Sequence, residues 1–176
     1  EELDRIAGIR SDLVAALRDE FADSSLNVKV DEKTGAITFD ASVLFDVADS
    51  DLKEEGKMFL KEFLPKYCNV LLDEKYRDYV SEIIIEGHTD TNGSYIYNLE
   101  LSQQRAFSVA KYCLTESNGI ISSKDVELLR SVLTANGKSY SNPIYKEDGS
   151  VDLEASRRNA AQQARQSYLS VNSGLS

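Results

Sequence analysis

A change of hydrophobic period between residues 81 and 110 constrains this chain more than any other feature. Residues 83–85 are three isoleucines, a β-branched run too short for a helix, and Gly87 with the polar residues after it ends the run. From Asn98 onward, apolar side chains recur at helical spacing on one stripe. The pattern predicts a buried strand, a loop, and a helix with Asn98 as its N-cap.

A carboxylate and a guanidinium are expected to meet at one edge of this strand, loop and helix. Asp90 follows the strand, and Arg105 lies on the helix. Arg105 shares an edge with Asn98, because seven residues at roughly 100° each bring two side chains to within about 20°. Folding the helix back on the sheet would place Asp90 and Arg105 at one pocket rim. Residue types alone allow two interpretations: an ion pair that ties the loop to the helix, or a ligand site.

This region contains, in order, Gly87-His88-Thr89-Asp90, Gly93, Asn98, Leu101-Ser102 and Arg105-Ala106. Their order and spacing resemble the OmpA-like peptidoglycan-binding domain, and the resemblance extends over about residues 36–158. That family includes outer-membrane porins, peptidoglycan-associated lipoproteins and flagellar stator B subunits. The resemblance implies an α/β sandwich, a β-α-β-α-β mixed sheet with helices packed on one face, here preceded by an N-terminal helix and hairpin.

The resemblance also implies a ligand and the residues that hold it. Diaminopimelate in a peptidoglycan stem peptide ends in a carbon that carries both an ammonium and a carboxylate. Asp90 would accept protons from the ammonium, and Arg105 would hold the carboxylate in a bidentate pair. Asn98 would orient the loop or donate to the ligand, Thr89 would add a backbone or hydroxyl contact, and Arg157 matches a further pocket position. The implied function is non-covalent binding that anchors a membrane protein or motor stator to the wall, without a cofactor or metal.

The residues before the resemblance predict a helix and a hairpin. Residues 1–22 place apolar side chains three or four apart among charged ones, which is typical of an amphipathic helix. Two alternating runs, residues 26–30 and 36–39, flank a turn. The helix has two open interpretations: it packs on its own domain, or it is the entry of a stalk or coiled coil from a membrane segment outside this chain.

Local patterns predict the other elements. The extended stretch 42–46 and the residues after it resemble the family's first strand and the exit loop that forms part of its pocket. Pro65 is expected to kink or break a helix at 51–72. The remaining predicted helices run from Asn98 to about Thr115 and from Ser122 or Ser123 to about Leu133. Residues 135–144 resemble the family's short strand and the Gly-rich loop after it.

The last part of the chain departs from the family. Residues 154–158 resemble its Asn-Arg-Arg element, with Ser156 in place of Asn, but the Ala- and Gln-rich residues that follow lack the β-branched side chains of a closing strand. Either the sheet lacks its last strand, or another segment such as residues 168–171 fills that place. The expected organisation is a helix and hairpin extension at 1–35, an OmpA-like domain at 36–158, and an atypical tail, helical or disordered, at 159–176.

Composition narrows the partners and the location. A net charge of −10 argues against nucleic acid, whose binding depends on clustered Lys and Arg. The sequence has no run of about 18 apolar residues and begins at Glu1, so we expect a fragment anchored through a membrane segment outside it. The expected location is the extracytoplasmic side of the cell envelope, with peptidoglycan, a membrane ion-channel subunit and a second copy of the chain as candidate partners. Cys68 and Cys113 are expected to be buried thiols.

Two other function classes are possible alternatives to wall binding: a hydrolase and a dimerising structural domain. A hydrolase could use His88, Asp90 and Ser102, but the chain has no Gly-x-Ser-x-Gly elbow, and a Ser inside a helix tends to bond back to the chain. A zinc site would need more His, Cys or carboxylate ligands at suitable spacing. The third class is a structural domain of an envelope protein that dimerises through residues 1–22. The sequence therefore predicts a binding module rather than an enzyme.

Overall fold

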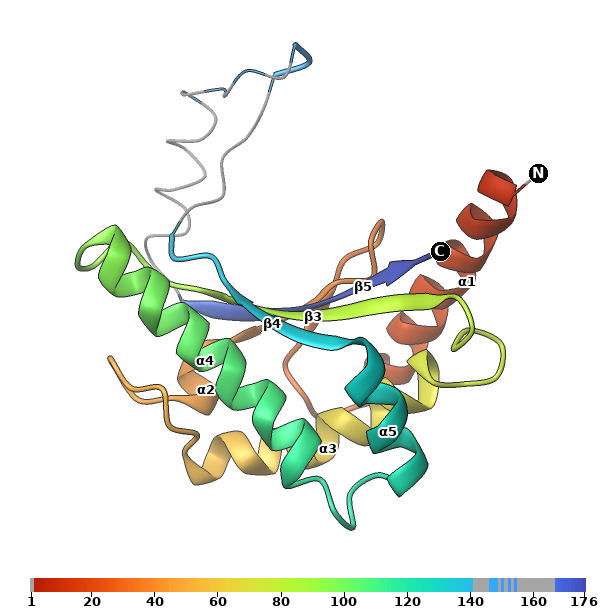
Figure 1. Ribbon diagram of the computed structural model, residues 1–176, viewed down its shortest axis with the longest axis horizontal. Coiled ribbons are helices and arrows are strands. Elements are labelled where there is room, and N and C mark those ends of the chain that lie inside the picture. Colours follow the sequence, from red (N-terminus) through yellow and green to blue (C-terminus); the bar gives the residue numbers. More distant parts are fainter. Residues whose placement is uncertain (1, 141–145, 149, 151, 153, 155–166) are drawn as a thin grey trace.

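The computed structural model describes residues 2–140, 146–148, 150, 152, 154 and 167–176. Its five strands form one mixed sheet in the order β1-β2-β5-β3-β4, and helices α2 to α5 lie on one face of it (Figure 1). The pair β3 and β4 is parallel, whereas the other three strand pairs are antiparallel. The elements are α1 (Glu2–Ala22), β1 (Lys29–Val30), β2 (Ile37–Asp40), α2 (Ala41–Leu44), α3 (Glu54–Leu71), β3 (Val80–His88), α4 (Tyr95–Thr115), α5 (Ser123–Val132), β4 (Leu133–Gly137) and β5 (Tyr168–Leu175).

The core lies between the sheet and the helices. Ile83 and Ile85 of β3 are 1% and 2% exposed, and Ile85 pairs with the buried Val171 of β5. Glu86, the next residue after Ile85, points to the opposite face of the sheet, because successive side chains of a strand alternate between the two faces. Each fully buried side chain of this size contributes roughly 1.5–3 kcal/mol, so the isoleucine run fixes the register of β3.

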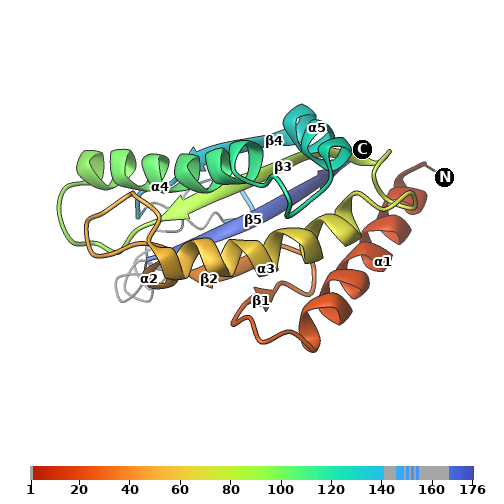
Figure 2. The same ribbon diagram turned by 90° about the horizontal axis from the view of Figure 1, so that it is seen from below.

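Two glycines allow α4 to lie directly on the sheet. A Cβ at Gly87 would be 2.3 Å from the carbonyl oxygen of Ser102, and one at Gly137 would be 2.4 Å from the backbone nitrogen of Gln103. Any side chain at either position would therefore push the helix outward. This close contact brings the first turns of α4, which carry Asn98 and Arg105, over the carboxyl end of β3 (Figure 2).

The N-terminal helix shares the core of the domain over its second half. Leu17 and Phe21 are buried, and the ring of Phe21 stacks on Phe63 of α3 at 5.4 Å between centroids. Arg10 donates hydrogen bonds to the carbonyl oxygens of Thr34 at 2.8 Å and Ser173 at 3.0 Å. Of the two interpretations of this helix, these contacts favour packing on its own domain, while its first turns project beyond the sheet (Figure 1).

Three predicted elements differ from the structure. The stretch 42–46 was expected to be extended, but α2 occupies residues 41–44, because Asp40 accepts a hydrogen bond from the backbone N–H of Ser42 at 2.8 Å and starts a helical turn. Helix α4 begins at Tyr95, with Ser94 as N-cap, so Asn98 is not the cap. Helix α3 continues through Pro65 as one element rather than two. The hairpin, β4, α5 and the end of α4 are as predicted.

The tail prediction is wrong for residues 168–175. Residues 168–175 form β5, which lies between β2 and β3, rather than helix or disorder. The alternative that residues 168–171 fill the place of the closing strand is therefore confirmed. Leu169 and Val171 alternate with polar residues and enter the core, which is the pattern that stabilises a strand here. Residues 159–166 lie outside the described part of the chain, and so does Arg157.

Candidate functional site

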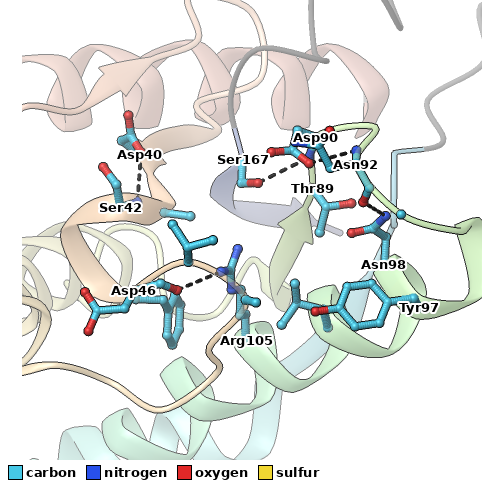
Figure 3. Close-up of a pocket in the computed structure, with 16 residues that line it drawn as sticks. Asp40, Ser42, Asp46, Thr89, Asp90, Asn92, Tyr97, Asn98, Arg105 and Ser167 are labelled. Atoms are coloured by element: carbon cyan, nitrogen blue, oxygen red, sulfur yellow. Dashed lines mark hydrogen bonds between the residues drawn. The ribbon is translucent and has the colours of Figure 1, made fainter.

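A cavity of about 530 Å³ opens at the edge of the sheet where β3 ends (Figure 3). Its walls come from the end of β2 with the α2–α3 connection, from the β3–α4 loop, and from the first turns of α4. A cavity of this size accommodates an amino-acid end group. The lining residues are Asp40, Ala41, Ser42, Phe45, Asp46, Val47, Ala48, Thr89, Asp90, Asn92, Gly93, Tyr97, Asn98, Leu101, Arg105 and Ser167.

Arg105 forms the floor of this cavity and holds one of its walls. Its side chain is buried, at 6% exposure, with the guanidinium carbon 5.3 Å from the ring centroid of Phe45. Nε donates to the carbonyl oxygen of Asp49 at 2.8 Å, and Nη2 donates to that of Asp46 at 3.2 Å. A guanidinium has five N–H donors, so three remain for a ligand. The sequence predicted the position of Arg105 but not its bonds to the α2–α3 connection.

Asp90 faces the same cavity from the β3–α4 loop. Its Oδ1 accepts a hydrogen bond from the backbone N–H of Asn92 at 3.0 Å, and its own N–H donates to Oγ of Ser167 at 3.1 Å. The first bond is an Asx turn, which fixes the direction of the carboxylate. Ser167 was missed by the sequence analysis, because it precedes a strand that the composition of the tail concealed. Its hydroxyl orients Asp90 from the start of β5.

Asp90 and Arg105, both in the described part of the chain, interact electrostatically but do not form an ion pair. Burial lowers the pKa of Arg105 below its ordinary value, and the carboxylate of Asp90 opposes that shift. Arg105 stays charged, because an arginine pKa is far above neutrality. A direct ion pair was one interpretation of these two residues, and the structure instead places both on the wall of one cavity.

Asn98 orients the loop that carries Asp90. Its side chain is 2% exposed, and Nδ2 donates to the carbonyl oxygens of Asn92 at 2.7 Å and Ser94 at 3.0 Å. Gly93, between them, has a φ of 89°, which a residue with a side chain adopts only with strain. Of the two roles expected for Asn98, the structure shows the orienting one.

Thr89 carries a polar group without a partner. Its backbone N–H donates to the carbonyl oxygen of Ser139 at 2.9 Å, but its hydroxyl is buried and has no hydrogen-bond partner among the described residues. Leaving such a group unsatisfied costs about 1–3 kcal/mol. Because Thr89 lines the cavity, a polar ligand atom there would recover part of that free energy.

The comparisons with known proteins agree with this architecture. The model of the OmpA family matches residues 44–157, which is more than half of the chain. The chain belongs to the OmpA family. A Zorya protein ZorB of Escherichia coli is 31% identical over 154 residues, covering 81% of this chain and 63% of that protein. Outer membrane protein A of Shimwellia blattae is 37% identical over 112 residues, covering 64% of this chain and 40% of that protein.

Solved structures of low sequence identity share the fold of this OmpA-like domain. A MotB-like protein from Desulfovibrio vulgaris aligns with a TM-score of 0.59 at 18% identity, covering 97% of this chain and 94% of that one. The cell wall anchor of the type VI secretion system (T6SS) from Pseudomonas aeruginosa aligns with a TM-score of 0.50 at 20% identity, covering 94% and 99%. The chain spans less than two thirds of the ZorB relative, so the activity of the whole protein is a matter for proposal.

The candidate hydrolase residues of this OmpA-like domain do not meet. Ser102 is fully buried, and its hydroxyl donates to the carbonyl oxygen of Leu99 and accepts from the N–H of Ser139, both at 3.0 Å. His88 stacks on Tyr168 at 4.3 Å between ring centroids, and burial lowers its pKa to about 4. Neither residue lines the cavity that contains Asp90.

The described residues of this OmpA-like domain show neither a metal cluster nor a membrane-spanning helix. They contain no group of three or more His, Cys, Asp or Glu side chains placed to hold a metal ion. None of the described helices combines the length and apolarity that crossing a bilayer requires. Cys68 and Cys113 are buried free thiols, as predicted, and burial raises the pKa of Cys113 to about 12.

Proposed function

We propose that this OmpA-like domain binds peptidoglycan non-covalently by holding the zwitterionic end of diaminopimelate between Asp90 and Arg105. One observation carries the proposal: the two side chains line a single cavity with opposite charges and are not paired with each other. A ligand with an ammonium and a carboxylate on one carbon would supply an oppositely charged partner to each of these two side chains. The OmpA family relationship points to the same class of ligand.

The free hydrogen-bonding capacity of the site matches such an end group. The three remaining N–H donors of Arg105 can form a fork with a carboxylate, and Asp90 can accept from an ammonium. Thr89 also lines the cavity, and its buried hydroxyl has no hydrogen-bond partner among the described residues. Arg157, which matches a pocket position of the family, remains a proposed ligand residue.

Anchoring by this domain depends on many weak contacts. Each charge-assisted hydrogen bond contributes roughly 1.5–3 kcal/mol, and ordering the ligand consumes part of that, so one site binds weakly. A polymeric wall presents many sites, which makes the attachment of a multimeric protein stable. We propose that the domain anchors an envelope protein or motor stator on the extracytoplasmic side, with a membrane ion-channel subunit as partner. The names of its relatives, a MotB-like protein and a cell wall anchor, support that role.

Co-sedimentation with purified wall sacculi tests this function. The unchanged chain is expected to pellet with sacculi, whereas Asp90→Asn and Arg105→Ala should each remain in the supernatant. Arg130→Ala is the matched control, because Arg130 is an exposed arginine on α5, away from the cavity. Circular dichroism of each variant separates lost binding from lost folding. Equal sedimentation of all four proteins, or none by the unchanged chain, would contradict the proposal.

Self-association is a second candidate function, supported by the exposed end of α1. Leu3 is 84% exposed on the first turn of a helix whose second half is buried. An exposed leucine on a protruding amphipathic helix favours contact with a second copy of the helix. Sedimentation equilibrium of the unchanged chain and of Leu3→Glu tests this, since the charge would abolish a dimer. A monomeric mass for the unchanged chain would exclude it.

A further inference from the structure

A tight turn in the wall of the cavity presents an apolar side chain to solvent. Residues 46–49 form the turn, closed by a hydrogen bond of 3.0 Å from the N–H of Asp49 to the carbonyl oxygen of Asp46. Ala48 has a φ of 60°, at the position where a type II turn needs a positive φ and glycine is favoured. Val47, beside it, is 97% exposed. Neither residue is one that a turn prefers on its own account.

Hydrogen bonds from side chains of α4 hold the turn in place. Arg105 donates to the carbonyl oxygens at both of its ends, Asp46 and Asp49. Ser108 of α4 donates to the carbonyl oxygen of Ser50 at 2.6 Å, just after the turn, and Phe45, just before it, is buried. The exposure of Val47 is therefore a fixed feature of the cavity wall. Residues kept in unfavourable local conformations by their surroundings are concentrated at ligand sites.

The aromatic ring of a tyrosine lies across the cavity from this turn. Tyr97, on the first turn of α4, lines the same cavity and is 47% exposed. Figure 3 shows Asp46 of the turn and Tyr97 on opposite sides of Arg105. Val47 on the turn and the aromatic ring of Tyr97 on the helix therefore line the same cavity as the charged side chains of Asp90 and Arg105.

We propose that Val47 and Tyr97 form an apolar subsite that takes the alkyl chain of the bound diamino acid. This inference rests on the proposed function, because Asp90 and Arg105 must first hold the zwitterionic end. Behind that end group, diaminopimelate has three methylene groups before its second amino-acid carbon. Those methylenes would pass between Val47 and Tyr97. The subsite makes the cavity selective for amino-acid ends on a long carbon chain over short ones.

A series of D-amino acids separates the charged site from the apolar one. D-alanine presents the zwitterion with a methyl group, D-norleucine adds three carbons to it, and meso-diaminopimelate is the full ligand. Binding to the intact chain would be followed by NMR titration. We expect D-norleucine to bind about tenfold more tightly than D-alanine, less than three fully buried methylenes would give, because the cavity is open to solvent. In Val47→Ser and in Tyr97→Ala this ratio should fall to about threefold or less.

The controls keep loss of the apolar subsite distinct from loss of folding or of the charged site. Leu3→Ser removes an exposed apolar side chain that does not line the cavity and should leave the ratio unchanged. D-alanine affinity should be the same in all variants, which shows that Asp90 and Arg105 are intact. An unchanged ratio in Val47→Ser, or an equal loss of D-alanine and D-norleucine affinity, would overturn the apolar subsite alone. Failure of the unchanged chain to bind meso-diaminopimelate would instead overturn the proposed function and this inference with it.

Discussion

The guanidinium of Arg105 donates from Nε to the backbone carbonyl oxygen of Asp49 at 2.8 Å, joining residues that are 56 positions apart in the chain. The side chain proposed to hold the ligand carboxylate therefore also holds the wall opposite it. Ligand affinity and the position of the wall are coupled through one residue. Within the described part of the chain, the hydrogen bonds of Asp90 lie in its own loop and with Ser167, so no second role of this kind is seen for it there.

Replacing Arg105 is expected to reduce stability as well as binding. Arg105→Ala leaves two carbonyl oxygens of the α2–α3 connection without their donors and removes a side chain packed on Phe45. The free energy of unfolding should fall by about 2–4 kcal/mol. Arg105→Lys keeps the charge but has one nitrogen in place of the separate Nε and Nη2 that reach the two carbonyls, so it should lose about half as much stability. Urea unfolding measures the stability of both variants. Equal stability of Arg105→Ala and the unchanged chain would contradict a role of Arg105 in holding the α2–α3 connection.

Replacing Asp90 by asparagine should affect binding only. The amide oxygen of Asp90→Asn can still accept from the N–H of Asn92, so the loop keeps its turn. Loss of the negative charge removes a charge-assisted hydrogen bond to the ligand ammonium, which corresponds to about a tenfold weaker Kd. The free energy of unfolding should stay within about 0.5 kcal/mol. Calorimetric titration with meso-diaminopimelate tests the first expectation, and a matching urea curve tests the second.

Acid should weaken the fold through the only histidine of the chain. Burial lowers the pKa of His88 from 6.5 to about 4, so between these values the unfolded chain binds a proton that the folded chain does not. His88 therefore does not reduce the free energy of unfolding above about pH 6.5. As the pH drops toward 4, that free energy falls by up to about 3 kcal/mol. His88→Phe keeps an aromatic ring against Tyr168 and removes the proton site.

The pH dependence of urea unfolding between pH 5 and 7 isolates this effect from the carboxylates, which titrate mostly below that range. The unchanged chain should lose stability across it, and His88→Phe should show a flatter profile. Parallel profiles for the two proteins would mean that His88 is not the group responsible.

The strand and helix around the site could be predicted because their signals are local. The isoleucines at 83–85 and the helical stripe after Asn98 are visible in any short window, and Asp90 and Arg105 follow from the position of the loop between them. The N-cap was misplaced because Ser94 and Asn98 are both good caps, and the choice depends on which one the loop can reach.

The missed features depend on contacts that residue types do not encode. Any residue offers a backbone carbonyl, so nothing in the letters marks Asp46 and Asp49 as the partners of Arg105. Strand β5 was concealed for a different reason. Its alternating Leu169 and Val171 follow a long Ala- and Gln-rich stretch, and it becomes a strand because β2 and β3 leave a place between them.

A single methyl group at Gly87 should separate α4 from the sheet and disrupt the site. The added Cβ of Gly87→Ala would be 2.3 Å from the carbonyl oxygen of Ser102, a backbone atom that cannot move without the helix. The free energy of unfolding should fall by about 2 kcal/mol or more, as it does at other overpacked positions. Wall binding should also weaken, because Arg105 is part of the helix that is displaced. Gly8→Ala is the matched control: nothing lies within 4 Å of its added Cβ, and alanine favours the helix by about 0.5–1 kcal/mol. Urea unfolding should move the two variants in opposite directions, and a stable, binding-competent Gly87→Ala would show that close contact between α4 and β3 is not what positions the site.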